Sequence, residues 1–329
     1  MQKHSYIINE FTLESGKKFR DLELCYCTEG TFIPGKSKVV WVCHALTASA
    51  DCVEWWPDLI GENNAINSKD HFIICVNIPS SCYGSSGPLK EKLYGNFPVF
   101  TIRDMVNAFI HLRKYLAIEK IHLLIGGSMG GYQCVEWAIM EQNVIEHLAL
   151  VATGARESAW GIAIHTAQRI AIEADPSFGE KRDDAGARGL KAARAIGMLT
   201  YRNYEAFVKT QSDDDDRITE QKAESYIHYQ GEKLVKRFNA YSYWLLTKSM
   251  DSHNVARGRG EMNELLKTIK AKTIVIGITS DFLCPLPEQH YLAAQIPGAE
   301  FHPIESPFGH DGFLVEGKKI GILIKKFIP

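Results

Sequence analysis

The chain has 329 residues, of which 37 are Lys or Arg and 39 are Asp or Glu, so its formal net charge is −2 at pH 7. This balance gives no field that would attract nucleic acid or an acidic membrane surface, and we expect neither as a partner. The hydrophobic content of 45% is ordinary for a globular protein, and the length fits one large α/β domain or two smaller domains.

The amino-terminal segment and the cysteines both favour the cytoplasm. Residues 1–12 are polar and broken, unlike a signal peptide, and no apolar run approaches the length of a membrane span. None of the eight cysteines forms a C-x-x-C pair, and five fall within apolar runs: Cys25, Cys27, Cys43, Cys75 and Cys134. We therefore expect a cytoplasmic protein with buried thiols and with no bound metal or cofactor.

Apolar and alternating segments predict a mostly parallel β-sheet. Residues 5–11 and 19–27 alternate enough to suggest an antiparallel edge. A helix is expected to begin at Thr101, where Asp104 nearly completes a capping box. Further strands are expected at 39–43, 71–78, 122–125, 148–153, 273–278 and 300–304. Alternating strands and helices indicate an α/β sheet flanked by helices on both faces.

A long segment without strands separates the last two predicted strands from the others. Helical periodicity recurs there at 159–174, 189–199, 220–236 and 241–250. We interpret residues 155–258 as a helical lid, inserted in a core made of residues 1–154 and 259–329. The acidic run 213–216 within the lid is interpreted as a solvated loop, because four adjacent carboxylates cannot all point at one cation.

Residues 121–140 predict a buried strand, a tight turn around one serine and a helix. Gly126-Gly127-Ser128-Met129-Gly130 fits G-x-S-x-G, in which a nucleophilic serine sits on a strained strand-to-helix turn. Glycines fit there because side chains would collide with neighbouring backbone. The alternative is that the short pattern arises by chance and Ser128 only caps the helix. The flanking strand and helix favour the nucleophile.

A serine nucleophile needs a base, and the base needs an acidic partner that orients it. Asp281 and His310 both follow predicted strands, and the order Ser128, Asp281, His310 is that of α/β-hydrolases. Taken singly, Asp281 could be a turn residue and His310 a structural histidine. The main rival acids rank lower because none directly follows a strand as Asp281 does: Asp251, Glu305 and Asp311.

The loop after the strand at 39–43 is a candidate for part of an oxyanion hole. In this kind of sheet the backbone N–H groups of Leu46 and Met129 would point at the developing oxyanion. An ordinary strand-to-loop transition is the alternative for residues 44–47. The loop at 79–88 could line a pocket mouth or be only a long connection.

Several longer motifs resemble the homoserine O-acetyltransferase family, and the similarity runs over nearly the whole chain. The core motifs are Gly126–Gly131 with Glu136–Ala138, Cys43–Thr47, Phe97-Pro98 with Thr101–Val106, and Ser306–Asp311 with Phe313-Leu314. The lid motifs are Ala155-Arg156, Ser158–Trp160, Gln168-Arg169, Leu199–Arg202 and Tyr229–Gly231. The chain departs from the family in the loop Ile78–Cys82, which lacks a glycine pair, and at Ala48–Ala50.

This resemblance implies an α/β-hydrolase fold, with Ser128 as nucleophile, His310 as base and Asp281 as its acid. It also implies that Arg194 and Tyr201 face the amino-acid substrate and that Asp311 holds its ammonium. Such charges suit homoserine, because a carboxylate needs a forked cationic donor and an ammonium needs a carboxylate.

The expected activity is a double-displacement acyl transfer in methionine synthesis. An acyl group, acetyl by resemblance, passes from acyl-CoA to Ser128 and then to the homoserine hydroxyl, and the family implies a homodimer. Succinyl transfer, or serine as the acceptor, stays open. Two further functions also stay open: an esterase or thioesterase with the same triad, and a non-catalytic ligand sensor.

Overall fold

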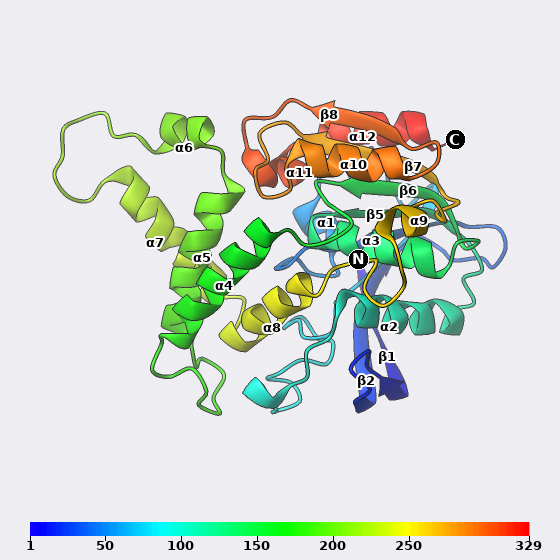
Figure 1. Ribbon diagram of the computed structural model, residues 1–329, viewed down its shortest axis with the longest axis horizontal. Coiled ribbons are helices and arrows are strands. Elements are labelled where there is room, and N and C mark those ends of the chain that lie inside the picture. The colour runs from blue at the N-terminus through cyan, green and yellow to red at the C-terminus, as the bar shows by residue number, and fades with distance from the viewer. Residues whose placement is uncertain (329) are drawn as a thin grey trace.

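A single eight-stranded sheet forms the centre of the protein in a computed structural model that describes residues 1–328 (Figure 1). The strand order is β1-β2-β4-β3-β5-β6-β7-β8; β1 and β2 are antiparallel to their neighbours, and the pairs from β4 to β8 are parallel. The strands are β1 (Gln2–Thr12), β2 (Lys18–Glu29), β3 (Lys38–Cys43), β4 (His71–Val76), β5 (Ile121–Gly127), β6 (Ile145–Val151), β7 (Lys272–Ile278) and β8 (Glu300–Ile304). The prediction of a mostly parallel sheet with an antiparallel edge is confirmed.

Helices cover both faces of this sheet, as expected for parallel strands. On one face Trp137 of α3 packs against Trp41 of β3, with their ring centroids 4.9 Å apart. On the other face α12 buries Ile320 and Ile324. The core helices are α1 (Cys52–Trp55), α2 (Ile102–Tyr115), α3 (Met129–Met140), α9 (Met262–Leu266), α10 (Leu286–Gln295), α11 (Gly312–Val315) and α12 (Gly317–Phe327), with short 3-10 turns at Tyr94–Asn96 and Gly309–Asp311.

The predicted start of α2 is confirmed at Thr101. Its side chain accepts the backbone N–H of Asp104, and the Asp104 carboxylate accepts the backbone N–H of Thr101, which completes the capping box. The same Asp104 carboxylate also accepts the backbone N–H of Glu14, so this cap ties α2 to the loop after β1.

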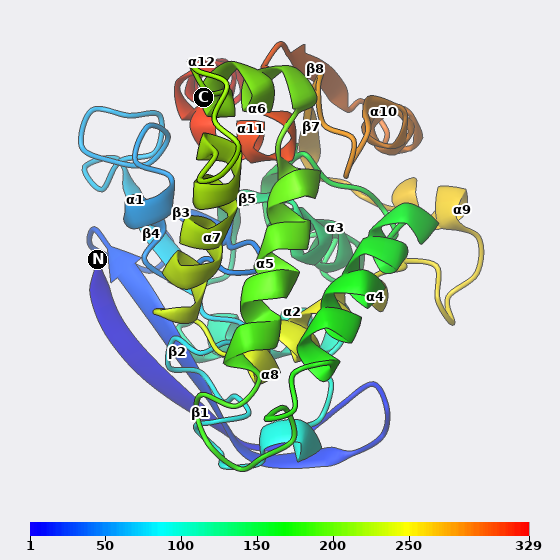
Figure 2. The same ribbon diagram turned by 90° about the vertical axis from the view of Figure 1, so that its left-hand side faces the viewer.

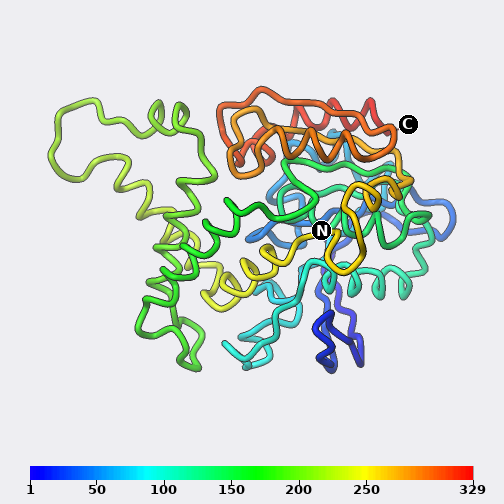
Figure 3. The backbone as a smooth tube through the Cα atoms, viewed as in Figure 1, coloured from blue at the N-terminus to red at the C-terminus, as the bar shows by residue number. Residues whose placement is uncertain are grey.

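Six helices lie between β6 and β7, and the first five, α4 to α8, form a separate lobe beside the sheet (Figures 1 and 3). We name this lobe the helical insertion. In Figure 2 its helices α4, α5 and α7 face the viewer. No β-strand occurs in this part of the described chain. The insertion comprises α4 (Ala159–Glu173), α5 (Ala187–Tyr201), α6 (Tyr204–Gln211), α7 (Lys222–Val235) and α8 (Ala240–Asp251).

The acidic run lies in the loop between α6 and α7. Asp214 pairs with Lys222 at 2.7 Å, and Asp215 pairs with Arg217 at 2.7 Å. These pairs are exposed, in keeping with the interpretation of residues 213–216 as a solvated loop.

A charge network centred on the buried Glu136 joins the core to the segment of chain that returns from the insertion. Glu136 of α3 accepts from Arg103 of α2 at 2.7 Å and from Arg259 at 2.6 Å. Arg103 and Arg257 in turn both pair with Glu14 at 2.6 Å. The segment after α8 is therefore held against α2, α3 and the loop after β1.

Among the helices of residues 1–328, none combines the length and the apolar character that crossing a membrane requires.

Candidate active site

The turn between β5 and α3 holds Ser128 in an unusual backbone conformation. Ser128 has φ 55° and ψ −126°, a region that non-glycine residues occupy only when the surrounding structure enforces it. The turn lies against the end of β3, since a Cβ added at Gly130 would stand 2.1 Å from the carbonyl oxygen of Cys43. The turn therefore presents the serine hydroxyl at the carboxyl edge of the sheet.

Ser128, His310 and Asp281 form one continuous hydrogen-bonded chain. His310 Nε2 lies 2.8 Å from Ser128 Oγ, and His310 Nδ1 lies 2.7 Å from Asp281 Oδ2. The second carboxylate oxygen of Asp281 accepts the backbone N–H groups of Leu283 and Cys284, both at 2.9 Å. The side chains of Ser128, His310 and Asp281 are all buried. This arrangement can move a proton from the hydroxyl to the imidazole while the carboxylate fixes the tautomer of the ring.

The electrostatic surroundings favour a charged imidazole at His310. Burial alone would lower the pKa of His310, but the charge and the hydrogen bond of Asp281, together with the charges of Asp311 and Glu157, outweigh burial, so the pKa lies above its ordinary value. The imidazolium that forms when Ser128 loses its proton is therefore stabilised.

The three rival acids are engaged or directed elsewhere. Asp251 lies 2.8 Å from the ring of a different histidine, His165. Glu305 is exposed. Asp311 Oδ2 lies 3.1 Å from the Nε of Arg202. Within residues 1–328, Asp281 is thus the acid that hydrogen-bonds to His310.

A cavity of about 750 Å³ opens over Ser128 and His310. Its wall is shared between the core and the helical insertion. The insertion contributes Arg194 and Tyr201 of α5, and the loop at 79–88 contributes Tyr83, so that loop reaches the cavity wall. Gly309, at φ +62°, lies so close to the end of α5 that a Cβ there would stand 2.8 Å from the carbonyl oxygen of Tyr201. The helical insertion therefore packs directly on the turn that carries His310.

The residues expected to face an amino acid all line this cavity. The guanidinium carbon of Arg194 lies 5.6 Å from the ring centroid of Tyr201, and its buried Nε has no partner within the described chain. Burial raises the pKa of Asp311, although Arg202, His310 and Arg194 oppose that rise. The pairing of Asp311 with Arg202 was not predicted, because sequence spacing gives no sign of which arginine turns toward it.

The loop after β3 brings Leu46, one of the two expected oxyanion-hole residues, to the cavity. Leu46 lines the cavity, and Met129 begins α3, where backbone N–H groups lack intrahelical partners.

His44 fixes the loop after β3: its Nδ1 lies 2.9 Å from the Ala45 carbonyl oxygen, and its Nε2 accepts the backbone N–H of Ile78 at 3.1 Å. Burial lowers the pKa of His44 to about 4, so the ring is neutral near pH 7. The sequence offered no sign of this role beyond a histidine directly after a strand.

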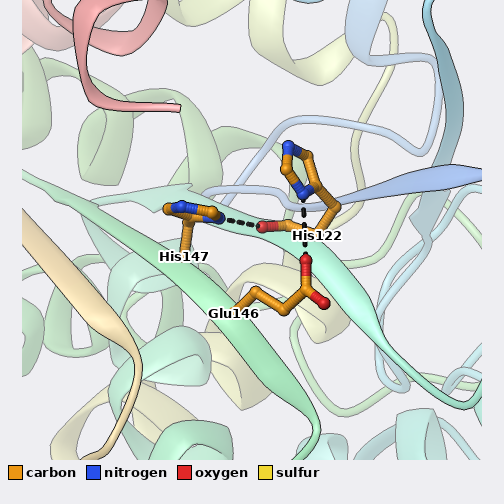
Figure 4. Close-up of side chains that lie close together, drawn as sticks. All are labelled: His122, Glu146 and His147. Carbon is orange, nitrogen blue, oxygen red and sulfur yellow. Dashed lines mark hydrogen bonds and ion pairs between the residues drawn. The ribbon is translucent and has the colours of Figure 1, made fainter. Parts of the chain in front are cut away.

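Two groups of side chains in residues 1–328 could supply three metal ligands. One is the catalytic candidate itself, Asp281 and His310 with Cys284. The other is His122, Glu146 and His147, near the amino ends of β5 and β6 (Figure 4). There His122 Nδ1 lies 3.0 Å from Glu146 Oε2, and His147 Nδ1 lies 2.9 Å from the His122 carbonyl oxygen (Figure 4). These bonds account for the cluster without an ion.

The sheet order, the strained serine turn and the Ser–His–Asp chain together define an α/β-hydrolase-fold protein. In agreement, the sequence model of the alpha/beta hydrolase fold family matches residues 38–317. The crystal structure of esterase E22 superposes with a TM-score of 0.89 at 20% identity, covering 100% of both chains, which reflects the shared fold.

Closer relatives identify the family within that fold. The homoserine O-acetyltransferase of Cyclobacterium marinum is 41% identical over 332 residues, covering 99% of this chain and 95% of the relative. The crystal structure of homoserine O-acetyltransferase from Staphylococcus aureus has a TM-score of 0.83 at 28% identity, covering 99% of this chain and 94% of that one. The chain belongs to the homoserine O-acetyltransferase family of acyltransferases, which confirms the resemblance seen in its motifs.

Proposed function

We propose that this protein transfers an acetyl group from acetyl-CoA to the hydroxyl of L-homoserine through an ester of Ser128. The unbroken Ser128–His310–Asp281 chain, opening on a cavity that holds a guanidinium and a carboxylate, carries this proposal. The names of the relatives support homoserine and acetyl as the reacting partners.

In the first half-reaction Ser128 becomes acylated. His310 Nε2 takes the hydroxyl proton as Ser128 Oγ attacks the thioester carbonyl, and the negative charge develops on the carbonyl oxygen. The backbone N–H groups of Leu46 and Met129 stabilise that oxyanion. The C–S bond then breaks, and the proton held by His310 goes to the CoA thiolate.

The second half-reaction repeats these roles with the acceptor. His310 removes the proton of the homoserine hydroxyl, whose oxygen attacks the Ser128 ester. The C–O bond to Ser128 breaks, and the proton returns to Ser128 Oγ. Arg194 binds the acceptor carboxylate as a forked donor, Tyr201 packs beside it, and Asp311 faces the ammonium.

We assign the helical insertion, with its flanks at residues 155–258, the role of a lid over a core of residues 1–154 and 259–329. A lid suppresses hydrolysis of the acyl-serine by keeping water away from the ester. The protein would act in the cytoplasm as a homodimer, in the synthesis of methionine.

Hydrolysis of esters or thioesters is the second candidate, because the same triad would pass the acyl group to water when no acceptor is bound. The two activities differ in one observable. A transferase releases CoA in proportion to the homoserine consumed, whereas a thioesterase releases it without an acceptor.

A steady-state assay tests the proposal by crossing acetyl-CoA and succinyl-CoA with homoserine and serine. We expect the fastest turnover with acetyl-CoA and homoserine, parallel double-reciprocal lines, and an acetyl group on Ser128 in the mass spectrum. Ser128→Ala should lose about 10⁴-fold or more in kcat, by analogy with other serine triads. An unchanged transfer rate in this variant would refute the assignment.

A further inference from the structure

A second histidine faces the cavity from the helical insertion. His165 of α4 lines the cavity and is only 3% exposed. Its Nδ1 lies 2.8 Å from Asp251 Oδ1 of α8 and 3.9 Å from Glu157 Oε2. The reaction steps derived above do not use this imidazole, although it shares one cavity with Ser128.

The groups around His165 hold its ring in one orientation. Asp251 is itself fixed by Arg169, whose Nη2 lies 2.7 Å from Asp251 Oδ2. Glu157 accepts the backbone N–H of Ser158 at 3.0 Å and the hydroxyl of Tyr132 at 3.2 Å. Because Tyr132 lies on α3, this cluster also connects the insertion to the helix that follows Ser128.

The free ring nitrogen of His165 is available to a ligand. With Nδ1–H donated to Asp251, Nε2 carries the lone pair and can only accept a hydrogen bond. Within residues 1–328 Nε2 has no hydrogen-bond partner, and it is not among the fully enclosed polar atoms that lack one. The small exposed part of this side chain therefore includes an acceptor atom, on a residue that lines the cavity.

The charged groups around His165 favour a cationic hydrogen-bond donor at its Nε2. Two carboxylates, Asp251 and Glu157, face His165, and one guanidinium, Arg169, pairs with Asp251. An incoming cation would face these two acidic side chains, whereas the cationic groups that line the same cavity, Arg194, Lys233 and Arg237, would attract the carboxylate of the acceptor. Asp311, which lines the cavity together with Glu54, already pairs with Arg202 and so can satisfy only part of an ammonium with three N–H donors.

We propose that His165, held by Asp251, is a binding residue for the amino group of the acyl acceptor. It accepts one ammonium N–H at Nε2, in addition to the contact expected from Asp311. This inference rests on the proposed transfer to an amino-acid hydroxyl, and it extends that site to a wall formed by α4 and α8.

The test compares two acceptors that differ only in the amino group. L-Homoserine carries the ammonium, and 4-hydroxybutyrate keeps the hydroxyl and the carboxylate but lacks it. We expect His165→Leu to lower the ratio of kcat/KM for homoserine to that for 4-hydroxybutyrate by about 10- to 100-fold, the usual effect of losing a hydrogen bond to a charged group. His165→Gln keeps an acceptor oxygen and should recover part of the ratio.

Further variants and readouts separate binding from folding. His253→Gln is the matched control, because His253 is also buried and stacks on Tyr132 at 4.0 Å but is not among the described residues that line the cavity. This control should leave the acceptor ratio unchanged. Acylation of Ser128 by acetyl-CoA without acceptor should proceed in both His165 variants at the wild-type rate.

One outcome would overturn the inference. If His165→Leu and His165→Gln leave the ratio of kcat/KM for the two acceptors unchanged, whether or not both rates fall, the amino group is not the ligand of His165. Failure of the wild-type protein to acylate homoserine is a different result, because it contradicts the proposed function itself.

Discussion

Ser128 shows at the scale of one residue how the fold produces a reactive group. A positive φ at a serine costs free energy, of order 1–3 kcal/mol for a strained backbone conformation. The parallel strands on both sides and the helix behind it hold the residue there, so that its hydroxyl meets His310 Nε2 at 2.8 Å. In the proposed mechanism the reactivity of the hydroxyl depends on His310 as the base, and Asp281 raises the pKa of that base.

Replacing Asp281 tests that dependence through pH. A general base works only when neutral, so kcat/KM should fall as the pH drops through the pKa of His310, which Asp281 raises. In Asp281→Asn that pKa is lower, so the acidic limb of the profile should move to lower pH. The rate on the plateau should fall by about 10⁴-fold, because the ring loses its correct tautomer.

The pH–rate profile of acetyl transfer measures both effects. Glu305→Gln serves as the control, since Glu305 is an exposed acid near the same turn. This control should leave both the limb and the plateau in place. A limb that stays at the wild-type pH in Asp281→Asn would show that Asp281 does not set the pKa of the catalytic base.

Elements with strong local patterns could be predicted from the sequence. The turn at Ser128, the capping box at Thr101 and the helices α4 and α8 follow from glycine positions, a cap and apolar periodicity. The helices α6, α10 and α12 were not predicted. The α6 helix has only eight residues and buries none of them, and its large apolar residues, Tyr204, Phe207 and Val208, span little more than one turn, which is too short a stripe to mark a helix.

Contacts between distant elements could not be predicted in this way. His165 and Asp251 are 86 residues apart and lie on different helices, and nothing local indicates that α4 and α8 pack together. The Ser128, His310 and Asp281 set could be predicted only because parallel strands bring their carboxyl ends to one edge, so that chain order and strand ends indicate proximity.

The network at Glu136 is a testable link between elements. Its side chain is 3% exposed and compensates two guanidinium groups, those of Arg103 and Arg259. In Glu136→Ala both charges would stay partly buried without this partner, so we expect a loss of about 3–5 kcal/mol in the free energy of unfolding. Urea denaturation followed by circular dichroism measures the loss.

The control for this prediction is Glu264→Ala. Glu264 pairs with Lys267 at 2.8 Å in an exposed position, and such pairs contribute about 0–1 kcal/mol. If the two variants unfold at the same urea concentration, the network around Glu136 does not stabilise the junction between the insertion and the core.

At the scale of the whole molecule, the helical insertion both completes the cavity and, with its flanks, carries eight of the 17 large apolar side chains that are exposed in residues 1–328. α5 lines the cavity, and α4, α5, α6 and α7 each expose at least one apolar residue to solvent. These exposed residues include Ile170, Leu199, Tyr204 and Tyr229. A contiguous apolar patch is typical of a protein–protein interface, so we propose this lobe as the place of the homodimer interface.

Disrupting that surface tests the homodimer. Ile170 of α4 is 59% exposed, so Ile170→Glu should not disturb folding, but burying a carboxylate in an interface is costly, and the variant should sediment as a monomer. Ile322→Glu on α12, where the isoleucine is 56% exposed, is the matched control and should sediment like the wild type. Sedimentation velocity across a range of concentrations measures both. A wild-type protein that is monomeric at every concentration would contradict the homodimer. Dimers in both variants would show that Ile170 of α4 does not lie in the interface.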